Sequence, residues 1–223
     1  MISKTQRFKN DYKYVIFDFD GTINDTSPGI FAAFKKTLDV FGVDYSKVDF
    51  RRHIGPPLEY SFRELVGDDK WMEAIPVYRK IFIEDDGLRN SKLYDGVKET
   101  LAAVKKCGYV VALATSKYEP FALESLKMLD IEQYFDYVYA QNDRRQYKDE
   151  ILSQLIGDNG WDKSLCVMVG DTHFDVQGAH ANGIDVIAVT YGFEDKDALV
   201  ALSPEAVVDS PREIYQALTG KKL

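Results

Sequence analysis

Short apolar runs alternate with helical patterns along the second half of the chain, and this alternation restricts the fold more than any other feature. Strands that are apolar almost throughout, each followed by a helix, indicate a parallel sheet covered on both faces. The predicted fold class is therefore α/β, a doubly wound, Rossmann-like parallel sheet of about six strands. The expected strands are residues 14–17, 109–115, 137–140, 165–171, 186–192 and 206–209.

Residues 25–90 interrupt this alternation, because they contain helical patterns and no convincing strand. Ser27 can cap a helix that has Pro28 at its first position. Two more helices are expected, at residues 56–67 and 71–83. We therefore expect an all-α cap domain, residues 25–90, inserted into an α/β core domain formed by residues 1–24 and 91–223.

Composition excludes several classes of partner. The chain has 223 residues, with 28 Lys and Arg against 36 Asp and Glu, a net charge of -8. This balance argues against broad nucleic-acid binding, which needs a basic face. No apolar run approaches the ~20 residues that span a bilayer, so no membrane partner is expected.

The expected location is the cytoplasm. The first thirteen residues are polar and charged, and lack the apolar segment of a signal peptide. Cys107 and Cys166 are the only cysteines, and both occur in apolar contexts. We predict that both are buried free thiols, which fits a reducing compartment.

Two acids follow the first predicted strand in the stretch YVIFDFDGT. Asp18 and Asp20 are two residues apart, so they share one face at the carboxyl end of the strand. Ligands bind at that end in open α/β sheets. Carboxylates this close repel one another unless a cation or a shared proton relieves them, and Mg²⁺ would do so while holding an anionic substrate.

A second acidic pair follows another predicted strand, in VMVGDTHFD. Asp171 and Asp175 come after the strand and its turn at Gly170. Because the carboxyl ends of parallel strands lie on one edge of a sheet, the four acids can converge on one ion. The predicted metal ligands are Asp18, Asp20, Asp171 and Asp175.

Hydroxyls and lysines are expected at the same edge. Thr115, Ser116 and Lys117 end the strand before, and Lys148 precedes the helix after the next one. Acids, hydroxyls and ammonium groups on one edge suit phosphoryl transfer, in which charge is neutralised and a nucleophile is placed in line.

The motifs DFDGT, TSK, Lys148 and GDTHFD resemble, in order and spacing, the four motifs of the haloacid dehalogenase-like (HAD-like) hydrolases. The helical insertion resembles the all-helical cap of that superfamily. The stretch HIGPPLEYSF, residues 53–62, resembles the phosphoglycolate phosphatase-like and 5'-nucleotidase-like subfamily. The resemblance covers nearly the whole chain, residues 14–218.

The resemblance implies a role for each matching residue. Asp18 is the expected nucleophile that forms an aspartyl-phosphate, and Asp20 the expected acid and base, with its backbone carbonyl on Mg²⁺. Thr115 and Lys148 are expected to hold the phosphoryl oxygens. Asp171 is expected to bind Mg²⁺ directly, and Asp175 directly or through water. The predicted substrate-binding residues are Gly21, Thr22, Ser116, Arg52 and Gly55.

Two positions keep alternatives open. Many relatives have Lys-Pro in the third motif where this chain has Lys148-Asp149, so Arg144 and Arg145 are candidate substitutes for the lysine. In the expected cap, Arg51, Arg52 and His53 form a charged run that is more often simply solvated. In the functional alternative, one of the three contacts the polar end of the substrate when the cap closes.

The sequence predicts a Mg²⁺-dependent phosphatase that acts on a small phosphate monoester. Phosphoglycolate, a nucleoside monophosphate and a sugar phosphate are the candidate substrates, so the expected partner is a small phosphorylated metabolite. The alternatives are a phosphomutase of the β-phosphoglucomutase type, a phosphonate hydrolase, and a non-catalytic small-ligand binding protein on the same scaffold. A monomer and a homodimer both fit.

Overall fold

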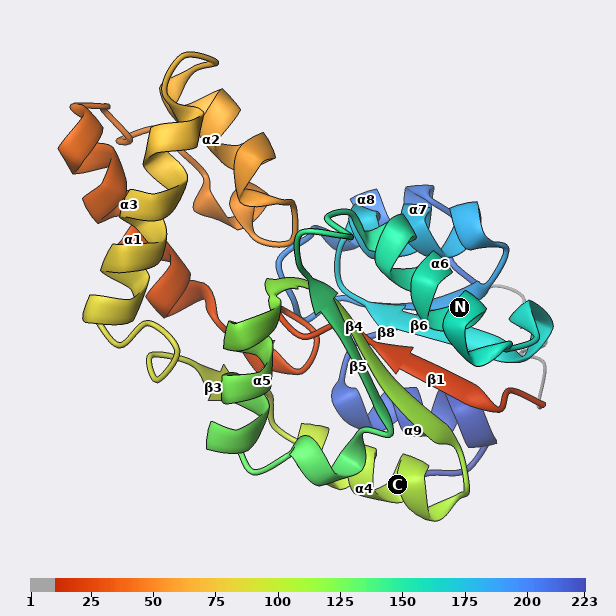
Figure 1. Cartoon of the computed structure of the whole chain (residues 1–223). Helices are drawn as coiled ribbons and strands as arrows, with labels where there is room; N and C mark the ends of the chain where they lie inside the picture. Colours follow the sequence, from red (N-terminus) through yellow and green to blue (C-terminus); the bar gives the residue numbers. More distant parts are fainter. Residues whose placement is uncertain (1–10) are drawn as a thin grey trace.

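A six-stranded parallel sheet forms the centre of the structure, a computed structural model that describes residues 11–223 (Figure 1). Its strands are β1 (Tyr14–Phe17), β4 (Val110–Tyr118), β5 (Tyr137–Gln141), β6 (Cys166–Gly170), β7 (Asp185–Val189) and β8 (Ala206–Val208). The strand order is β5-β4-β1-β6-β7-β8. The chain winds outward from β1 in one direction and then returns to wind in the other, so the topological switch point lies at β1.

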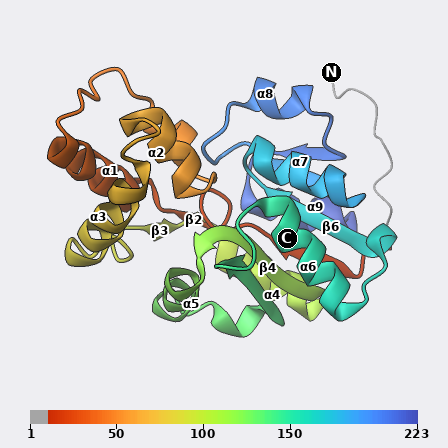
Figure 2. The same ribbon diagram turned by 45° about the horizontal axis from the view of Figure 1, so that its top comes forward.

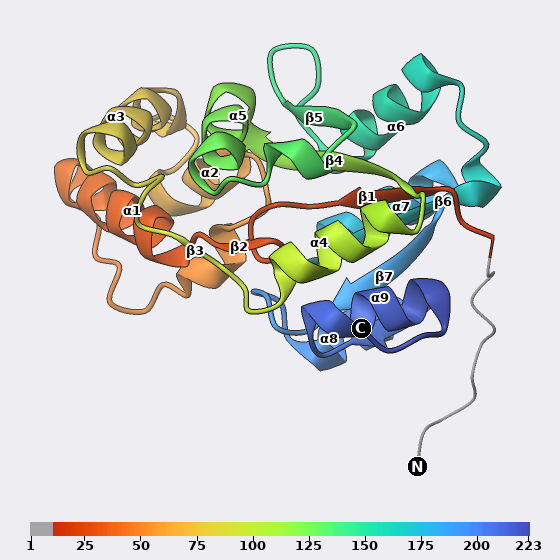
Figure 3. The same ribbon diagram turned by 90° about the horizontal axis from the view of Figure 1, so that it is seen from below.

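Helices cover both faces of this sheet (Figures 1 and 3). One face carries α6 (Lys148–Asn159), α7 (His173–Asn182) and α8 (Lys196–Ala201), and the other carries α4 (Val97–Lys106), α5 (Glu119–Met128) and α9 (Pro211–Thr219). Successive side chains of a strand point to opposite faces. Accordingly, Val15 and Phe17 lie in one apolar cluster and Ile16 in the other. The predicted α/β fold class is confirmed.

The segment between β1 and the rest of the sheet is helical and lies beside the carboxyl ends of the strands (Figures 1 and 2). It contains α1 (Ser27–Phe41), the 3-10 turn η1 (Phe50–His53), α2 (Leu58–Val66) and α3 (Trp71–Glu84). We call this segment the cap. Its interior is built on Phe34, whose ring centroid lies 5.3 Å from that of Phe62 and 4.8 Å from that of Tyr78.

A two-stranded ribbon joins the cap to the sheet. Strands β2 (Asn24–Asp25) and β3 (Lys92–Leu93) pair antiparallel, and the Asn24 side-chain amide donates a hydrogen bond to Ser91 Oγ at 2.9 Å. Such short strands carry no hydrophobic period, so the sequence pattern did not predict them. Of the two predicted boundaries of the cap, the one between residues 24 and 25 falls within β2, and the one between residues 90 and 91 falls just before β3.

One cysteine differs from its prediction. Cys166 is buried in β6, but Cys107 is exposed, so the prediction of two buried thiols is wrong for Cys107. It ends α4 in the surface turn before β4, and its apolar neighbours belong to β4 rather than to its own surroundings.

Among residues 11–223, no helix combines the length and apolarity that a membrane crossing requires.

Candidate active site

Asp18 is fixed at the end of β1, in the centre of the sheet. Its backbone N–H donates to the Val169 carbonyl of β6 at 2.9 Å, so the strand alignment itself sets its place. The side chain is only 3% exposed, and its Oδ1 lies 2.7 Å from Lys148 Nζ. Asp18 is therefore a buried carboxylate that is held in position by a buried cation.

Lys148 bridges several elements from the first residue of α6. Its ammonium donates to the Ala114 carbonyl at 2.9 Å and lies 2.8 Å from Asp175 Oδ1, in addition to its contact with Asp18. Burial alone would lower the pKa of the lysine, but the two carboxylates outweigh burial and raise it. Lys148 is therefore charged at neutral pH.

The altered third motif leaves this lysine in place. Arg145, a predicted substitute, is directed away from Asp18: it donates to the Ala140 carbonyl at 2.7 Å and pairs with Glu119 at 3.0 Å. Arg144 is exposed. With Lys148 paired to Asp18, neither arginine occupies the position of the lysine.

Asp18, Asp171 and Asp175 form a buried cluster in which each offers one oxygen, and these oxygens all lie within 4.8 Å of one another. The other oxygens are anchored. Thr22 Oγ1 and the Phe193 N–H donate to the two oxygens of Asp171, both at 2.9 Å. The predicted ligand Asp20 lies outside this carboxylate cluster.

Asp175 is anchored by its own helix. The Thr172 N–H and Oγ1 donate to Asp175 Oδ2 at 3.0 and 2.9 Å at the start of α7. This capping occupies Oδ2 and leaves Oδ1 directed to the cluster and to Lys148.

The charge of the cluster fits a divalent cation. With all three carboxylates ionised, the ammonium of Lys148 leaves two negative charges unbalanced in a buried site. Burial, with repulsion from neighbouring acids, raises the pKa of Asp18 to about 7 and that of Asp171 well above its usual value. An all-carboxylate donor set suits a hard cation such as Mg²⁺.

Glycines make room for the cluster. A Cβ on Gly21 or on Gly192 would overlap the Asp171 side chain, and Gly21 also has a φ of +86° that favours glycine. Gly21 and Thr22, both predicted to bind substrate, thus lie against the side chain of Asp171 and help to hold it in place.

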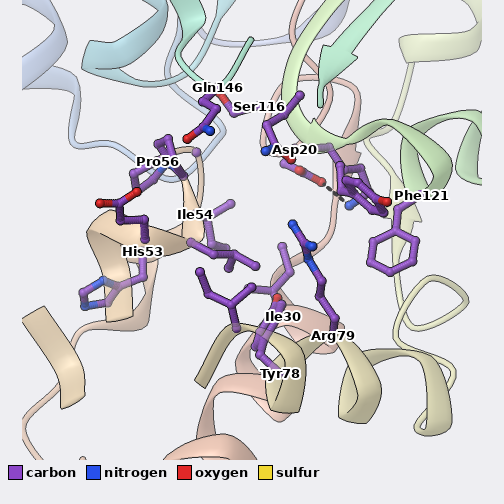
Figure 4. A pocket seen from close by; sticks show the side chains of 18 of the residues that line it. Asp20, Ile30, His53, Ile54, Pro56, Tyr78, Arg79, Ser116, Phe121 and Gln146 are labelled. Atoms are coloured by element: carbon purple, nitrogen blue, oxygen red, sulfur yellow. Dashed lines mark hydrogen bonds and ion pairs between the residues drawn. The ribbon is translucent and has the colours of Figure 1, made fainter. Parts of the chain in front are cut away.

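A cavity of about 330 Å³ lies between the cap and the core (Figure 4). Asp18, Asp20, Thr115 and Ser116 line its core side, so four of the predicted residues meet there. Gly55, a predicted residue of the cap, lines it as well. The remaining cap lining is largely apolar, with Ile30, Phe34, Ile54, Pro56, Ile75, Tyr78 and Phe82.

Asp20 reaches this cavity with a partner. Its Oδ1 lies 3.0 Å from Lys117 Nζ, and both side chains are buried. Lys117 N–H donates to Thr115 Oγ1 at 3.2 Å, which leaves the hydroxyl proton of Thr115 free for another acceptor. β4 continues to Tyr118 with a register shift after Thr115, so these residues form an irregular strand end that the apolar pattern did not predict.

Arg52 lies in a different place. It is exposed and lines a second hollow between the cap and the core, together with His173 and Glu194, whose Nδ1 and Oε2 are 2.6 Å apart. The structure therefore does not bring Arg52 together with the other predicted substrate-binding residues. His53 lines the first cavity, but its ring points away from Asp20 (Figure 4).

Arg79 is a cavity residue that the sequence did not single out. It occurs among other charges within a predicted helix, and nothing in the spacing separates it from them. Only the packing of α3 on the cavity identifies it.

Several known proteins are similar to this chain in sequence over most of its length. The family described as haloacid dehalogenase-like hydrolase matches residues 15–189. A 5'-nucleotidase of Pseudomonas aeruginosa is 34% identical over 199 residues, 86% of this chain and 89% of that protein. A phosphoglycolate phosphatase of Synechococcus elongatus is 30% identical over 208 residues, 92% of this chain and 96% of that protein.

The fold is also similar to that of a solved structure. The crystal structure of a predicted phosphatase from Clostridium acetobutylicum superimposes with a TM-score of 0.88 at 29% identity, covering 94% of this chain and 99% of that one. The predicted resemblance, subfamily included, is confirmed. The chain belongs to the haloacid dehalogenase-like hydrolases and is an enzyme of that family, whose relatives include phosphatases.

Proposed function

We propose that this enzyme is a Mg²⁺-dependent phosphatase that hydrolyses a small phosphate monoester through a phosphorylated Asp18. One observation carries the proposal: Asp18 lines the cavity between the cap and the core, and it also belongs to the buried acid cluster and contacts Lys148. Nucleophile, cation site and substrate cavity therefore share one carboxyl group. A solvated strand end would have none of these neighbours.

In the first step, an Asp18 carboxylate oxygen attacks phosphorus, and the bond from phosphorus to the ester oxygen breaks. Lys148 and the Thr115 hydroxyl are suited to hold the phosphoryl oxygens as charge develops on them. Asp20 gives its proton to the leaving alcohol. In the second step, water attacks phosphorus, Asp20 takes a proton from it, and phosphate leaves with Asp18 regenerated.

The ion pair between Asp20 and Lys117 has a place in this scheme. An ionised Asp20 held by an ammonium cannot deliver a proton. A phosphate ester entering the cavity competes for the ammonium of Lys117, because it carries more negative charge than a carboxylate. Release of Asp20 from Lys117 would then leave its carboxyl group free to face the leaving oxygen.

Mg²⁺ would be held by Asp18, Asp171 and Asp175, with the Asp20 carbonyl as the further ligand that the family resemblance implies. When bound, it would neutralise negative charge on the carboxylates and on the phosphoryl group. The acid cluster supports this assignment by its charge and its all-oxygen donors.

The lining of the cavity supports a substrate with an organic group beneath the cap. Its cap side is mostly apolar and aromatic, which suits a carbon skeleton and leaves few groups to satisfy a bare phosphate. The named activities of the relatives differ, so phosphoglycolate, nucleoside monophosphates and sugar phosphates all belong in the first substrate panel.

The test measures phosphate release from that panel with Mg²⁺, with EDTA, and by the variant Asp18→Asn. We expect release that needs the metal and disappears in Asp18→Asn, while Asp197→Asn, an exposed acid on α8, keeps full activity. Isomerised phosphate ester without free phosphate would identify a mutase instead. Binding without any turnover, by protein shown to be folded, would contradict the catalytic proposal.

A further inference from the structure

We propose that Arg79 binds a second anionic group of the substrate, a carboxylate or a second phosphate, beneath the cap. This inference rests on the proposed function, since it concerns the end of the substrate away from the reacting phosphoryl group. It assigns to Arg79 a role in substrate choice rather than in the chemical step.

The guanidinium of Arg79 faces the cavity without an acidic partner. The residue comes from α3, lines the cavity, and points toward the side where Asp20 and Ser116 lie (Figure 4). Its Nε is buried and makes no hydrogen bond. In the part of the chain that the structure describes, residues 11–223, no ion pair forms at this side chain. A half-buried guanidinium with an unused donor favours an anionic ligand.

The Tyr118 ring orients this guanidinium. Arg79 Cζ lies 4.5 Å from the ring centroid of Tyr118, at the end of β4 just beyond Thr115 and Ser116. Stacking on an aromatic ring uses the face of a guanidinium and leaves its N–H edge free, in the geometry that matches two oxygens of one anion. The group is thus held between the cap and the core, on the β4 side of the cavity.

Two other charged groups of the cavity already have partners of opposite charge. Lys117 pairs with Asp20, and Glu59 pairs with Arg63 at 2.9 Å. The exposed Asp143 also lines the cavity and would compete with the substrate for Arg79 if the cap moved toward it. The test must therefore separate substrate recognition from a contact between the cap and the core.

The test compares substrates in matched pairs that differ only in the second group. One pair is phosphoglycolate and its neutral amide, and the other is 1,3-propanediol bisphosphate and 3-hydroxypropyl phosphate. We expect the wild type to prefer the anionic member of one pair, which identifies the anion as carboxylate or phosphate. Arg79→Met should lower kcat/KM for that member by about 10- to 100-fold. For the neutral member, Arg79→Met should change kcat/KM by less than about 3-fold, because the contact with the second anion is absent there.

Two control variants accompany it. Lys80→Met removes the next cation of α3, which is exposed and near Glu84, and should leave both substrates unaffected. Arg79→Lys keeps the charge without the planar fork and should restore only part of the preference. An equal loss on both members in Arg79→Met would overturn the inference, because a contact with the transferring phosphoryl group or with Asp143 predicts that result. A wild type without preference for either anionic member would also overturn it.

A binding measurement separates this inference from the proposed function. Phosphonoacetate carries a phosphonate and a carboxylate but has no ester bond to break, and its amide lacks the carboxylate charge. Methylenebisphosphonate and methylphosphonate form the corresponding phosphate pair. If the wild type hydrolyses nothing, yet calorimetry shows tighter binding of one anionic member that Arg79→Met removes, the phosphatase proposal fails and the role of Arg79 stands. Equal affinities within both pairs would reject the role of Arg79.

Discussion

Lys148 Nζ lies 2.7 Å from Asp18 Oδ1 and 2.8 Å from Asp175 Oδ1, so one ammonium joins an acid at the end of β1 to an acid in the first turn of α7. The stem of this lysine packs on Gly178 of α7. A Cβ at Gly178 would lie 2.9 Å from Lys148 Cγ, closer than side chains approach one another. The position of the ammonium therefore depends on a glycine of the neighbouring helix.

We predict that Gly178→Ala lowers kcat by about 10-fold or more, because a misplaced contact of this kind commonly costs that much. The added methyl group must push the lysine stem away and displace Nζ from Asp18. Phosphate release and thermal unfolding would be measured together, since overpacking should also destabilise the fold by about 1–3 kcal/mol.

Gly157→Ala is the matched control. Gly157 lies within α6, and a Cβ there meets nothing within 4 Å. Alanine is the better helix former, so this variant should be slightly more stable, by about 0.5–1 kcal/mol, and fully active. Equal kcat values for the two variants would mean that Gly178 does not position Lys148.

Most of the correct predictions about the fold and the site came from the pattern of apolar strands. Strands such as β6 are apolar at every position because helices cover both faces of the sheet. The end of each apolar run therefore shows which acids lie at the shared carboxyl edge. Asp18, Asp20, Asp171 and Asp175 were predicted as a group on this ground, and the structure brings all of them except Asp20 within reach of one ion. The sequence thus predicted those side chains of the site whose position follows directly from the end of a strand.

Thr22 provides a test of the proposed metal site. Its hydroxyl donates to Asp171 Oδ1 at 2.9 Å, and the side chain is fully buried. Thr22→Val keeps the shape and removes the donor, so we predict that Mg²⁺ affinity falls about 10- to 100-fold, as is common when a partner of a metal ligand is lost. Titration calorimetry of the substrate-free protein would measure it.

Thr22→Ser keeps the hydroxyl and should retain most of that affinity. Unchanged Mg²⁺ affinity in Thr22→Val would argue that Asp171 needs no support from Thr22, or that it is not a metal ligand. Activity at saturating Mg²⁺ should recover in Thr22→Val, because the lost interaction acts through the metal.

The acid cluster makes the stability of the metal-free protein depend on pH. Burial raises the pKa of Asp18 from 3.8 to about 7, so between these values the folded state binds more protons than the unfolded state. Its contribution to stability is present below pH 4 and is lost as pH rises through about 7. In EDTA, we predict that Asp18→Asn gains stability relative to wild type between pH 5 and pH 8, by an amount on the order of a few kcal/mol.

Urea unfolding of both proteins at the two pH values measures this difference. His53 acts in the opposite direction, because burial lowers its pKa and stability is lost as pH falls. It is present in both proteins, so its contribution cancels from their difference. Mg²⁺ should stabilise the wild type more at pH 8 than at pH 5. A constant difference between wild type and Asp18→Asn across this range would contradict the raised pKa.

Contacts between the cap and the core could not be predicted from the sequence. They depend on how the two units pack together, which neither the helical pattern of the cap nor the strand pattern of the core determines. Arg52 and Arg79 look alike in the sequence, as cations in a helical segment. The packing of α3 directs Arg79 into the cavity, whereas η1 leaves Arg52 exposed at another hollow. Likewise, Lys117 was expected to suit a phosphate, but it pairs with Asp20 in the segment of β4 where the strand register shifts after Thr115.

The placement of the cap depends on a close approach of two glycines. Gly29 of α1 donates to the Asn90 carbonyl at 3.2 Å, and a Cβ on Gly29 would overlap the Gly87 carbonyl oxygen. A backbone carbonyl cannot rotate away as a side chain does. Gly29→Ala should therefore separate the two segments that enter and leave the cap.

We predict that Gly29→Ala lowers the melting temperature by about 2–10 °C, the shift expected from about 1–3 kcal/mol of overpacking. It should also raise KM about 3- to 30-fold for a nucleoside monophosphate that reaches the cap, because contact energy on the order of 1–2 kcal/mol is lost. Methyl phosphate, which fits against the core side alone, should show little change in KM. Val40→Ala, at an exposed position of α1, is the control. An equal rise in KM for both substrates would place the effect of Gly29 in the core, at Asp18 and its neighbours, instead of in the position of the cap.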